Sequence, residues 1–199
     1  MNDWSEYLES VCHSYAKWWQ IYTLSDVVEQ EEEEEDTIPL LDLGLMVETI
    51  DPEDDDLEQG EQQQKIERLT VLEGLRKYAP EHVLLIGRPG SGKSTALARL
   101  LLETAQDALV NAADQIPVLV ELRYYQTSIL DLVQNFLLRH RMRLNQDEIQ
   151  ELLFSGRFFL LVDGLNELPS VEARREVRVF RQTYPQTAMI WTTRELVVI

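Results

Sequence analysis

The first residues of the chain carry a regular stripe of apolar and aromatic positions. These positions recur at alternating steps of four and three, as on one face of a helix, and they are Trp4, Leu8, Val11, Tyr15, Trp18 and Tyr22. The spacing predicts an amphipathic helix within residues 1–28, and Asp3 followed by Glu6 can cap its start. An aromatic stripe of this kind is most often a packing face, either against its own chain or against a partner.

From Gln62 onward, stretches with helical periodicity alternate with short, continuously apolar runs. Helices are predicted at residues 66–75, 97–105, 129–137, 149–153 and 171–181. Buried parallel strands are predicted at residues 83–86, 118–120, 158–162 and 188–192, with the second strand starting after Pro117. Strands that alternate with helices at these lengths predict an α/β fold, a three-layer sandwich with a parallel sheet of about four strands, preceded by an acidic α-helical region.

Charge divides the chain into two parts. The formal net charge is −18; residues 1–61 hold 20 acidic residues and 1 basic residue, whereas residues 62–199 hold 16 and 17. The acidic stretches 29–36 and 51–58 repel themselves and are typical of solvated linkers. The apolar segment 38–50 between them is expected to dock on another surface. The acidic excess argues against a nucleic-acid-binding or anionic-membrane-binding protein.

Cysteine content and hydropathy bear on the cellular compartment. Cys12 is the single cysteine, which excludes an internal disulfide and fits a reducing cytosol. No apolar run approaches the length of a membrane span, and the first residues lack the basic and apolar regions of a secretion signal. We therefore expect a soluble, cytoplasmic protein.

The strongest chemical signal lies between the strand at 83–86 and the helix at 97–105. It fits the pattern G-x-x-x-x-G-K-[ST] and comprises Gly87, Arg88, Pro89, Gly90, Ser91, Gly92, Lys93, Ser94 and Thr95. The glycines let successive backbone N–H groups point at phosphates, and the helix adds its positive end. We expect Lys93 to reach the β- and γ-phosphates, Ser94 to hold Mg²⁺, and Thr95 to contact the α-phosphate.

Two further signals follow later strands. Asp163 ends the apolar run at 158–162, where a carboxylate faces the phosphates and can hold the Mg²⁺ shell, as in the Walker B element. Glu167 lies within reach to polarise an attacking water, and the alternative is a solvated or helix-capping acid. Arg194 follows the strand at 188–192 and can sense the γ-phosphate, and the alternative is a surface arginine that closes a strand.

Together the segments 87–95, 160–169 and 190–194 resemble the NACHT family of STAND nucleoside triphosphatases, in order and spacing as well as in motif. In the family, a glycine directly follows the Walker B aspartate, and an acidic pair follows the glycine. The corresponding segment of this chain, with a glycine directly after Asp163, looks most like that of bacterial members, cyanobacterial ones in particular. The resemblance covers about residues 72–195. It implies a P-loop NTPase fold in which Asp163 coordinates magnesium, Glu167 is the acid of the hydrolytic centre, and Arg194 is the sensor 1 arginine.

Two departures from the family pattern affect what the resemblance implies. Asn166 stands where many members have aspartate, which removes a carboxylate from the hydrolytic centre. The chain ends at Ile199, whereas family members continue into a fifth strand, a small helical domain and a winged-helix domain. We therefore expect an N-terminal helix at 1–28, an acidic linker at 29–61, and an incomplete NTPase core at 62–199 that is truncated after sensor 1.

The leading hypothesis is an ATP-binding switch with slow Mg²⁺-dependent hydrolysis, with GTP as the alternative nucleotide, in bacterial signalling or defence. Bound triphosphate and diphosphate then stabilise different arrangements, and the N-terminal aromatic helix passes the change to a protein partner. Self-association is a further expectation, and neither nucleic acid nor a membrane is expected as a partner. The alternative is a truncated nucleotide-binding interaction protein that hydrolyses weakly or not at all, as Asn166 and the missing lid domains suggest.

Overall fold

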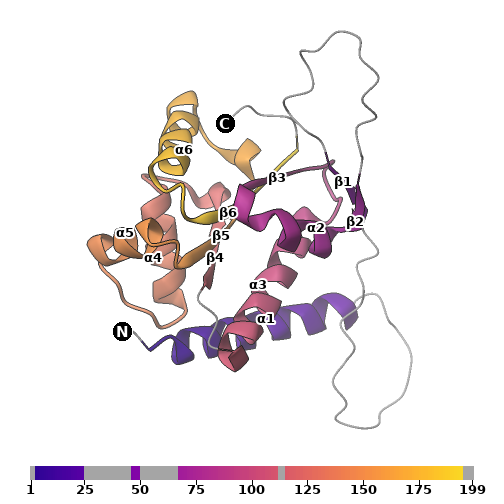
Figure 1. Cartoon of the computed structure of the whole chain (residues 1–199), viewed down its shortest axis with the longest axis horizontal. Coiled ribbons are helices and arrows are strands. Elements are labelled where there is room, and N and C mark those ends of the chain that lie inside the picture. Colours follow the sequence, from indigo (N-terminus) through magenta and orange to yellow (C-terminus); the bar gives the residue numbers. More distant parts are fainter. Residues whose placement is uncertain (1–2, 25–45, 50–66, 112–114, 195–199) are drawn as a thin grey trace.

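A four-stranded parallel sheet lies at the centre of the fold (Figure 1). The computed structural model describes residues 3–24, 46–49, 67–111 and 115–194. Its central strands are β3 (Val83–Ile86), β4 (Ile116–Glu121), β5 (Phe158–Asp163) and β6 (Ala188–Thr193). Their order is β3-β6-β5-β4, and each neighbouring pair is parallel. The α/β class and the four predicted strands are confirmed.

The two edge strands differ from each other in burial. β4 is as buried as the central strands β5 and β6, as expected for strands covered on both faces, whereas β3 is half-buried along its length. In β4 the predicted start was wrong, because Pro117 lies inside the strand. The N–H of Ile116 donates to the carbonyl of Arg157 beside β5 (2.8 Å), so Pro117 turns its nitrogen to the open edge, where no N–H is needed.

Helices cover both faces of the sheet. Figure 1 shows α4 (Ile129–Arg139), α5 (Gln146–Phe154) and α6 (Val171–Thr183) on one side, and α2 (Val71–Tyr78) and α3 (Lys93–Asn111) on the other. Ser128, Asn145 and Ser170 cap α4, α5 and α6, each accepting the backbone N–H three residues later. The predicted helices at 97–105, 129–137, 149–153 and 171–181 are therefore confirmed, and the sandwich has three layers.

The predicted helix at 66–75 was wrong in its first half. Arg68–Thr70 forms the strand β2, and α2 begins only at Val71. Thr70 caps α2, because its hydroxyl accepts the N–H of Glu73 (3.4 Å) while the Glu73 carboxylate accepts the N–H of Thr70 (3.1 Å). β2 pairs antiparallel with β1 (Met46–Glu48). The partner that makes this segment a strand thus lies far upstream, where local periodicity cannot reveal it.

The apolar segment at 38–50 docks as expected over the part that the structure describes. Val47 lies opposite Leu69 in the β1–β2 pair, and its Cγ2 atom would be 2.8 Å from a Cβ at Gly74 of α2. A side chain at position 74 would therefore push β1 away from α2. The remainder of this segment and the acidic stretches 29–36 and 51–58 lie outside the described residues.

The N-terminal helix α1 (Ser5–Leu24) packs along α3, and Tyr7, Leu8 and Val11 are buried in the common core. The Tyr7 hydroxyl donates to the carbonyl of Pro117 on the open edge of β4 (2.6 Å). Trp4 stacks edge-on against Phe158 of β5, with ring centroids 6.0 Å apart. In this half of the stripe, Leu8 and Val11 are buried and Trp4 is partly buried against the core, so these positions are a packing face within the chain, one of the two alternatives that the sequence left open. The side chains of Trp18 and Tyr22 lie outside the described residues.

His140 follows α4 and completes the contact with α1. Its Nδ1 atom lies 3.2 Å from the Ser10 hydroxyl, and its ring packs against Phe136, with centroids 4.6 Å apart. Burial, together with the charge of Arg139, lowers the pKa of His140 from 6.5 to about 4. A neutral imidazole therefore belongs to the packed interface between α1 and α4. Among the described helices, none combines the length and the apolar character needed to cross a bilayer.

Candidate functional site

The predicted site residues follow strand ends that meet at the carboxyl edge of the sheet. β6 lies between β3 and β5, so its end is adjacent to the ends of both. Ile86 lies opposite Thr193 in the β3–β6 register. The N–H of Gly87 donates to the carbonyl of Thr193 (3.2 Å) and ties the loop after β3 to the end of β6. This edge is the place where open α/β sheets bind ligands.

The glycine-rich loop, residues 87–92, leads from β3 into α3 as the sequence predicted. Gly90 and Gly92 have φ angles of 76° and 83°, a region that glycine enters at little cost. The N–H of Ser91 donates to the carbonyl of Arg88 (3.2 Å), which closes the turn. Arg88, Pro89 and Ser94 are exposed, and Thr95 is half-buried. The first turn of α3 has backbone N–H groups without intrahelical partners, which suit an anion.

Lys93 folds back over the loop. Its Nζ atom donates to the carbonyls of Gly87 (2.6 Å) and Arg88 (3.0 Å), and it lies 3.4 Å from the Ser91 hydroxyl. Partial burial lowers the pKa of Lys93, the carboxylate of Asp163 opposes this shift, and the charge of Arg194 adds to it. The ammonium group therefore lies within electrostatic reach of the two charged residues that end β5 and follow β6.

Asp163 is oriented by a residue of the neighbouring strand. The Thr192 hydroxyl donates to Asp163 Oδ1 (2.5 Å) and accepts the N–H of Gly164 (2.9 Å). Thr192 is buried, its bond to Gly164 is buried as well, and its bond to Asp163 is partly buried. A role for Thr192 was not predicted from the sequence. Its signal was a hydroxyl residue at the end of an apolar strand, beside the strand that ends in the carboxylate.

Glu167 and Arg194 lie together beyond the ends of β5 and β6. Their side chains form an ion pair of 3.6 Å in which both are partly exposed. Gly164, in the left-handed region with φ of 87°, turns the chain into the 3₁₀ turn η4 (Leu165–Glu167). A Cβ at Gly164 would lie 2.9 Å from Glu167 Oε2, so glycine leaves room for this carboxylate. Asn166 accepts the backbone N–H of Arg194 through Oδ1 (3.2 Å).

The available oxygen donors fit Mg²⁺. Ser94 is an exposed hydroxyl residue in the first turn of α3, and Asp163 is a half-buried carboxylate. Hydroxyl and carboxylate oxygens are hard ligands of the kind that Mg²⁺ prefers. No cluster of three or more His, Cys, Asp or Glu side chains suited to a metal occurs in the described ranges. Such a sparse set matches the way Mg²⁺ is held, by one or two protein ligands together with phosphate oxygens and waters.

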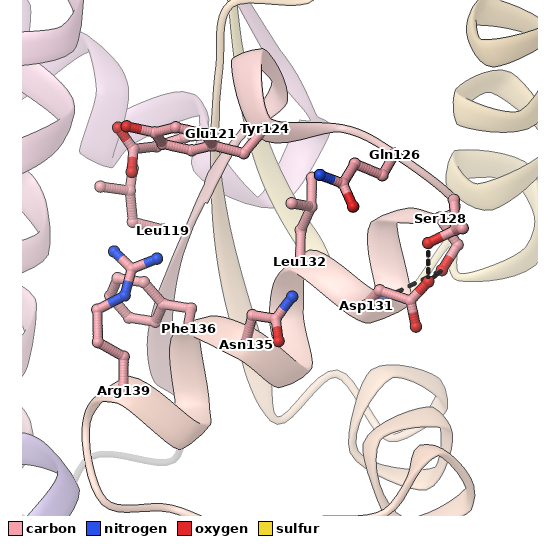
Figure 2. Close-up of a pocket in the computed structure, with 11 residues that line it drawn as sticks. Leu119, Glu121, Tyr124, Gln126, Ser128, Asp131, Leu132, Asn135, Phe136 and Arg139 are labelled. Carbon is pink, nitrogen blue, oxygen red and sulfur yellow. Dashed lines mark hydrogen bonds between the residues drawn. The ribbon is translucent and has the colours of Figure 1, made fainter.

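A cavity of about 190 Å³ lies elsewhere, between the open edge of β4 and α4 (Figure 2). Its lining includes Leu119 and Phe136 as apolar surface, with Glu121, Tyr124 and Arg139 at the rim. Figure 2 shows Glu121 and Tyr124 on the side of the cavity opposite Asn135 of α4. None of the predicted site residues lines this cavity. This cavity is therefore separate from the carboxyl edge of the sheet, where the predicted site residues lie.

Comparison with known proteins identifies the family. Among solved structures the chain is similar to PCH-2 of C. elegans, with 18% sequence identity and a TM-score of 0.35, over 62% of this chain and 35% of that chain. The chain thus spans about a third of that protein, and at this TM-score the likeness carries no argument. No curated protein matches this chain. The family model described as "NACHT domain" matches residues 81–196, which is more than half of the sequence. This chain belongs to the NACHT family of P-loop NTPases.

Proposed function

We propose that this chain is an ATP-binding switch module with slow Mg²⁺-dependent hydrolysis, which acts in bacterial signalling or defence from the cytoplasm. Membership of the NACHT family establishes the coarser statement, a nucleotide-binding signalling module. The observation that carries the finer proposal is the junction at the end of β6. Here Thr192 and Thr193 of β6 are hydrogen-bonded to Asp163 and to the glycine-rich loop, and Arg194, which follows the strand, forms an ion pair with Glu167.

The proposed roles follow the positions of the residues at this edge. The loop at 87–95 surrounds the phosphates with backbone N–H groups, and Lys93 releases its two carbonyl bonds to pair with the β- and γ-phosphates. Ser94 and Asp163 hold Mg²⁺, which neutralises phosphate charge when bound. Thr192 keeps Asp163 oriented for that task. Glu167 polarises the attacking water.

Arg194 gives the site a way to distinguish triphosphate from diphosphate. In the structure it pairs with Glu167 at 3.6 Å, and its side chain is 52% exposed. An exposed ion pair of this kind contributes about 0–1 kcal/mol, so a γ-phosphate with up to two negative charges can compete for the guanidinium. The backbone of Arg194 is bonded to Asn166 of η4. Movement of Arg194 toward phosphate therefore pulls on the loop that carries Glu167.

The direct test compares nucleotide binding and turnover in three proteins. The wild type is expected to bind radiolabelled ATP in Mg²⁺, and Lys93→Ala to lose binding by at least a hundredfold because the phosphates lose their cation. Glu167→Gln is expected to bind ATP normally and to lose turnover. Competition by unlabelled GTP measures the preference for ATP. ATP binding by the wild type that is no tighter than that of Lys93→Ala refutes the proposal.

The second candidate is a nucleotide-binding interaction protein that does not hydrolyse. It is favoured by two contacts that occupy the expected hydrolytic centre: Asn166 is bonded to the Arg194 backbone, and Glu167 is paired with the Arg194 side chain. The two candidates predict the same ATP affinity and differ in phosphate release. Turnover that disappears in Glu167→Gln excludes the second candidate, and binding without any release of phosphate supports it.

A further inference from the structure

A second arginine, Arg123, lies at the same edge of the sheet, and none of the roles proposed above involves it. The 3₁₀ turn η3 (Leu122–Tyr124) follows β4 directly, and η4 follows β5 after Gly164. β4 and β5 end in register, with Glu121 opposite Asp163. The two 3₁₀ turns consequently lie side by side and contact each other. Arg123 is the central residue of η3, whereas Glu167 ends η4.

Arg123 is held in place by two neighbours in sequence, one at the end of β4 and one in η3. Its guanidinium forms an ion pair with Glu121, and it also lies over the Tyr124 ring at 4.9 Å from the centroid. These two contacts restrict a side chain that is 57% exposed. Glu121 and Tyr124 also line the cavity in Figure 2, so the two residues that contact Arg123 belong to the wall of that cavity.

The charge of Glu167 reaches Arg123. Burial lowers the pKa of Arg123, but the carboxylate of Glu121, the phenol of Tyr124 and the carboxylate of Glu167 raise it, and the net shift is upward. Glu167 therefore has one arginine in direct contact and a second on the adjoining turn. Arg194 contacts it from the β6 side at 3.6 Å, and η3, which carries Arg123, contacts η4, which carries Glu167, from the β4 side.

We propose that Arg123 is a positioning residue for Glu167, which it retains at the site when Arg194 turns toward the γ-phosphate. The inference rests on the proposed function, because it assumes that Glu167 polarises water and that Arg194 responds to phosphate. Without a second cation, departure of Arg194 would leave Glu167 as an exposed carboxylate on a short turn, free to rotate into solvent. Arg123, itself fixed by Glu121, limits that rotation and keeps the carboxylate aimed at the water.

The test separates positioning from binding. Arg123→Ala is expected to lower kcat for ATP by roughly tenfold, a part of the 10²- to 10⁴-fold that a general base supplies, while the ATP dissociation constant stays within twofold. Arg123→Lys is expected to restore most of the lost rate, because it returns a cation. Glu121→Gln, which loosens the support of Arg123, is expected to give an intermediate rate. Arg175→Ala, a change at an exposed arginine of α6 that has no role in the proposed mechanism, is the matched control.

The outcomes distinguish failure of this inference from failure of the proposed function. Wild-type turnover that is lost in Lys93→Ala but unchanged in Arg123→Ala overturns the inference alone. The same holds if Arg123→Ala weakens ATP binding in proportion to the loss of rate, or if Arg123→Lys is as slow as the alanine variant. A wild type that binds ATP without turnover, or that does not bind it, overturns the inference together with the hydrolytic or the binding part of the proposed function.

Discussion

His140 provides a pH-dependent test of the contact between α1 and the rest of the chain. Its side chain is only 4% exposed, and it is enclosed by the rings of Phe136, Tyr7 and Tyr15. Burial and the charge of Arg139 lower its pKa from 6.5 to about 4. Because the folded pKa is the lower one, the unfolded chain binds the proton first. The stability that neutral His140 contributes is therefore complete above pH 6.5 and is lost as the pH falls toward 4.

The size of the effect follows from the two pKa values. At pH 5 protonation of the unfolded chain costs the folded state about 2 kcal/mol, and the full loss at pH 4 and below approaches about 3 kcal/mol. The measurement is the free energy of unfolding in urea at pH 7 and pH 5. His140→Asn keeps a polar group near the Ser10 hydroxyl and cannot titrate. Between pH 7 and pH 5, the free energy of unfolding of this variant should therefore fall by about 2 kcal/mol less than that of the wild type.

Other groups titrate over the same range, so the comparison between variants decides the outcome. His13→Asn, at an exposed position on α1, is the matched control and should retain the pH dependence of the wild type. If the wild type and His140→Asn lose equal stability between pH 7 and pH 5, the imidazole does not titrate between the folded and unfolded states as argued, and the reasoning is refuted.

Two further changes test single hydrogen bonds. Tyr7→Phe removes the donor to the Pro117 carbonyl and should lower the free energy of unfolding in urea by about 1–2 kcal/mol, because a buried carbonyl loses its partner; an unchanged value would mean that water replaces the hydroxyl. Thr192→Val removes the hydroxyl that orients Asp163 and should raise the Mg²⁺ concentration for half-maximal ATPase activity roughly tenfold or more, since such supporting bonds tune metal affinity. Thr183→Val, on the exposed face of α6, is the control, and identical Mg²⁺ titrations of the two valine variants would contradict this role of Thr192.

The sequence predicted the parts of the fold that local pattern determines. Strands such as Phe158–Asp163 are continuous apolar runs because both of their faces are covered. The helix Gln146–Phe154 was predicted at 149–153 because its apolar residues recur at helical spacing, and the structure extends it by a turn to the cap at Asn145. The glycine-rich loop was predictable for the same reason, since its glycines and its lysine are adjacent in the chain. Its position between a strand and a helix is confirmed.

The parts that the sequence did not predict depend on contacts between distant segments. Leu69 lies in a strand because Val47 pairs with it, and a helical row of apolar residues cannot reveal that partner. The apolar stripe of α1 was compatible with packing against its own core or against another molecule, and the burial of Leu8 and Val11 in the common core shows the first for the described side chains of the helix. Arg123 could not be predicted as part of this site, because its turn meets the turn of Glu167 only when β4 and β5 end in register.

The contact between Tyr7 and Pro117 also affects how the nucleotide-binding core can be isolated. An open strand edge is where a sheet accepts strands from other molecules. On β4 this edge lacks a donor at Pro117, and its carbonyl there is already bonded to α1. The family match begins at residue 81, but a fragment cut at that position would lose α1 and uncover both this carbonyl and the apolar surface of α3. Such a fragment would be expected to aggregate, so the smallest useful expression unit includes α1.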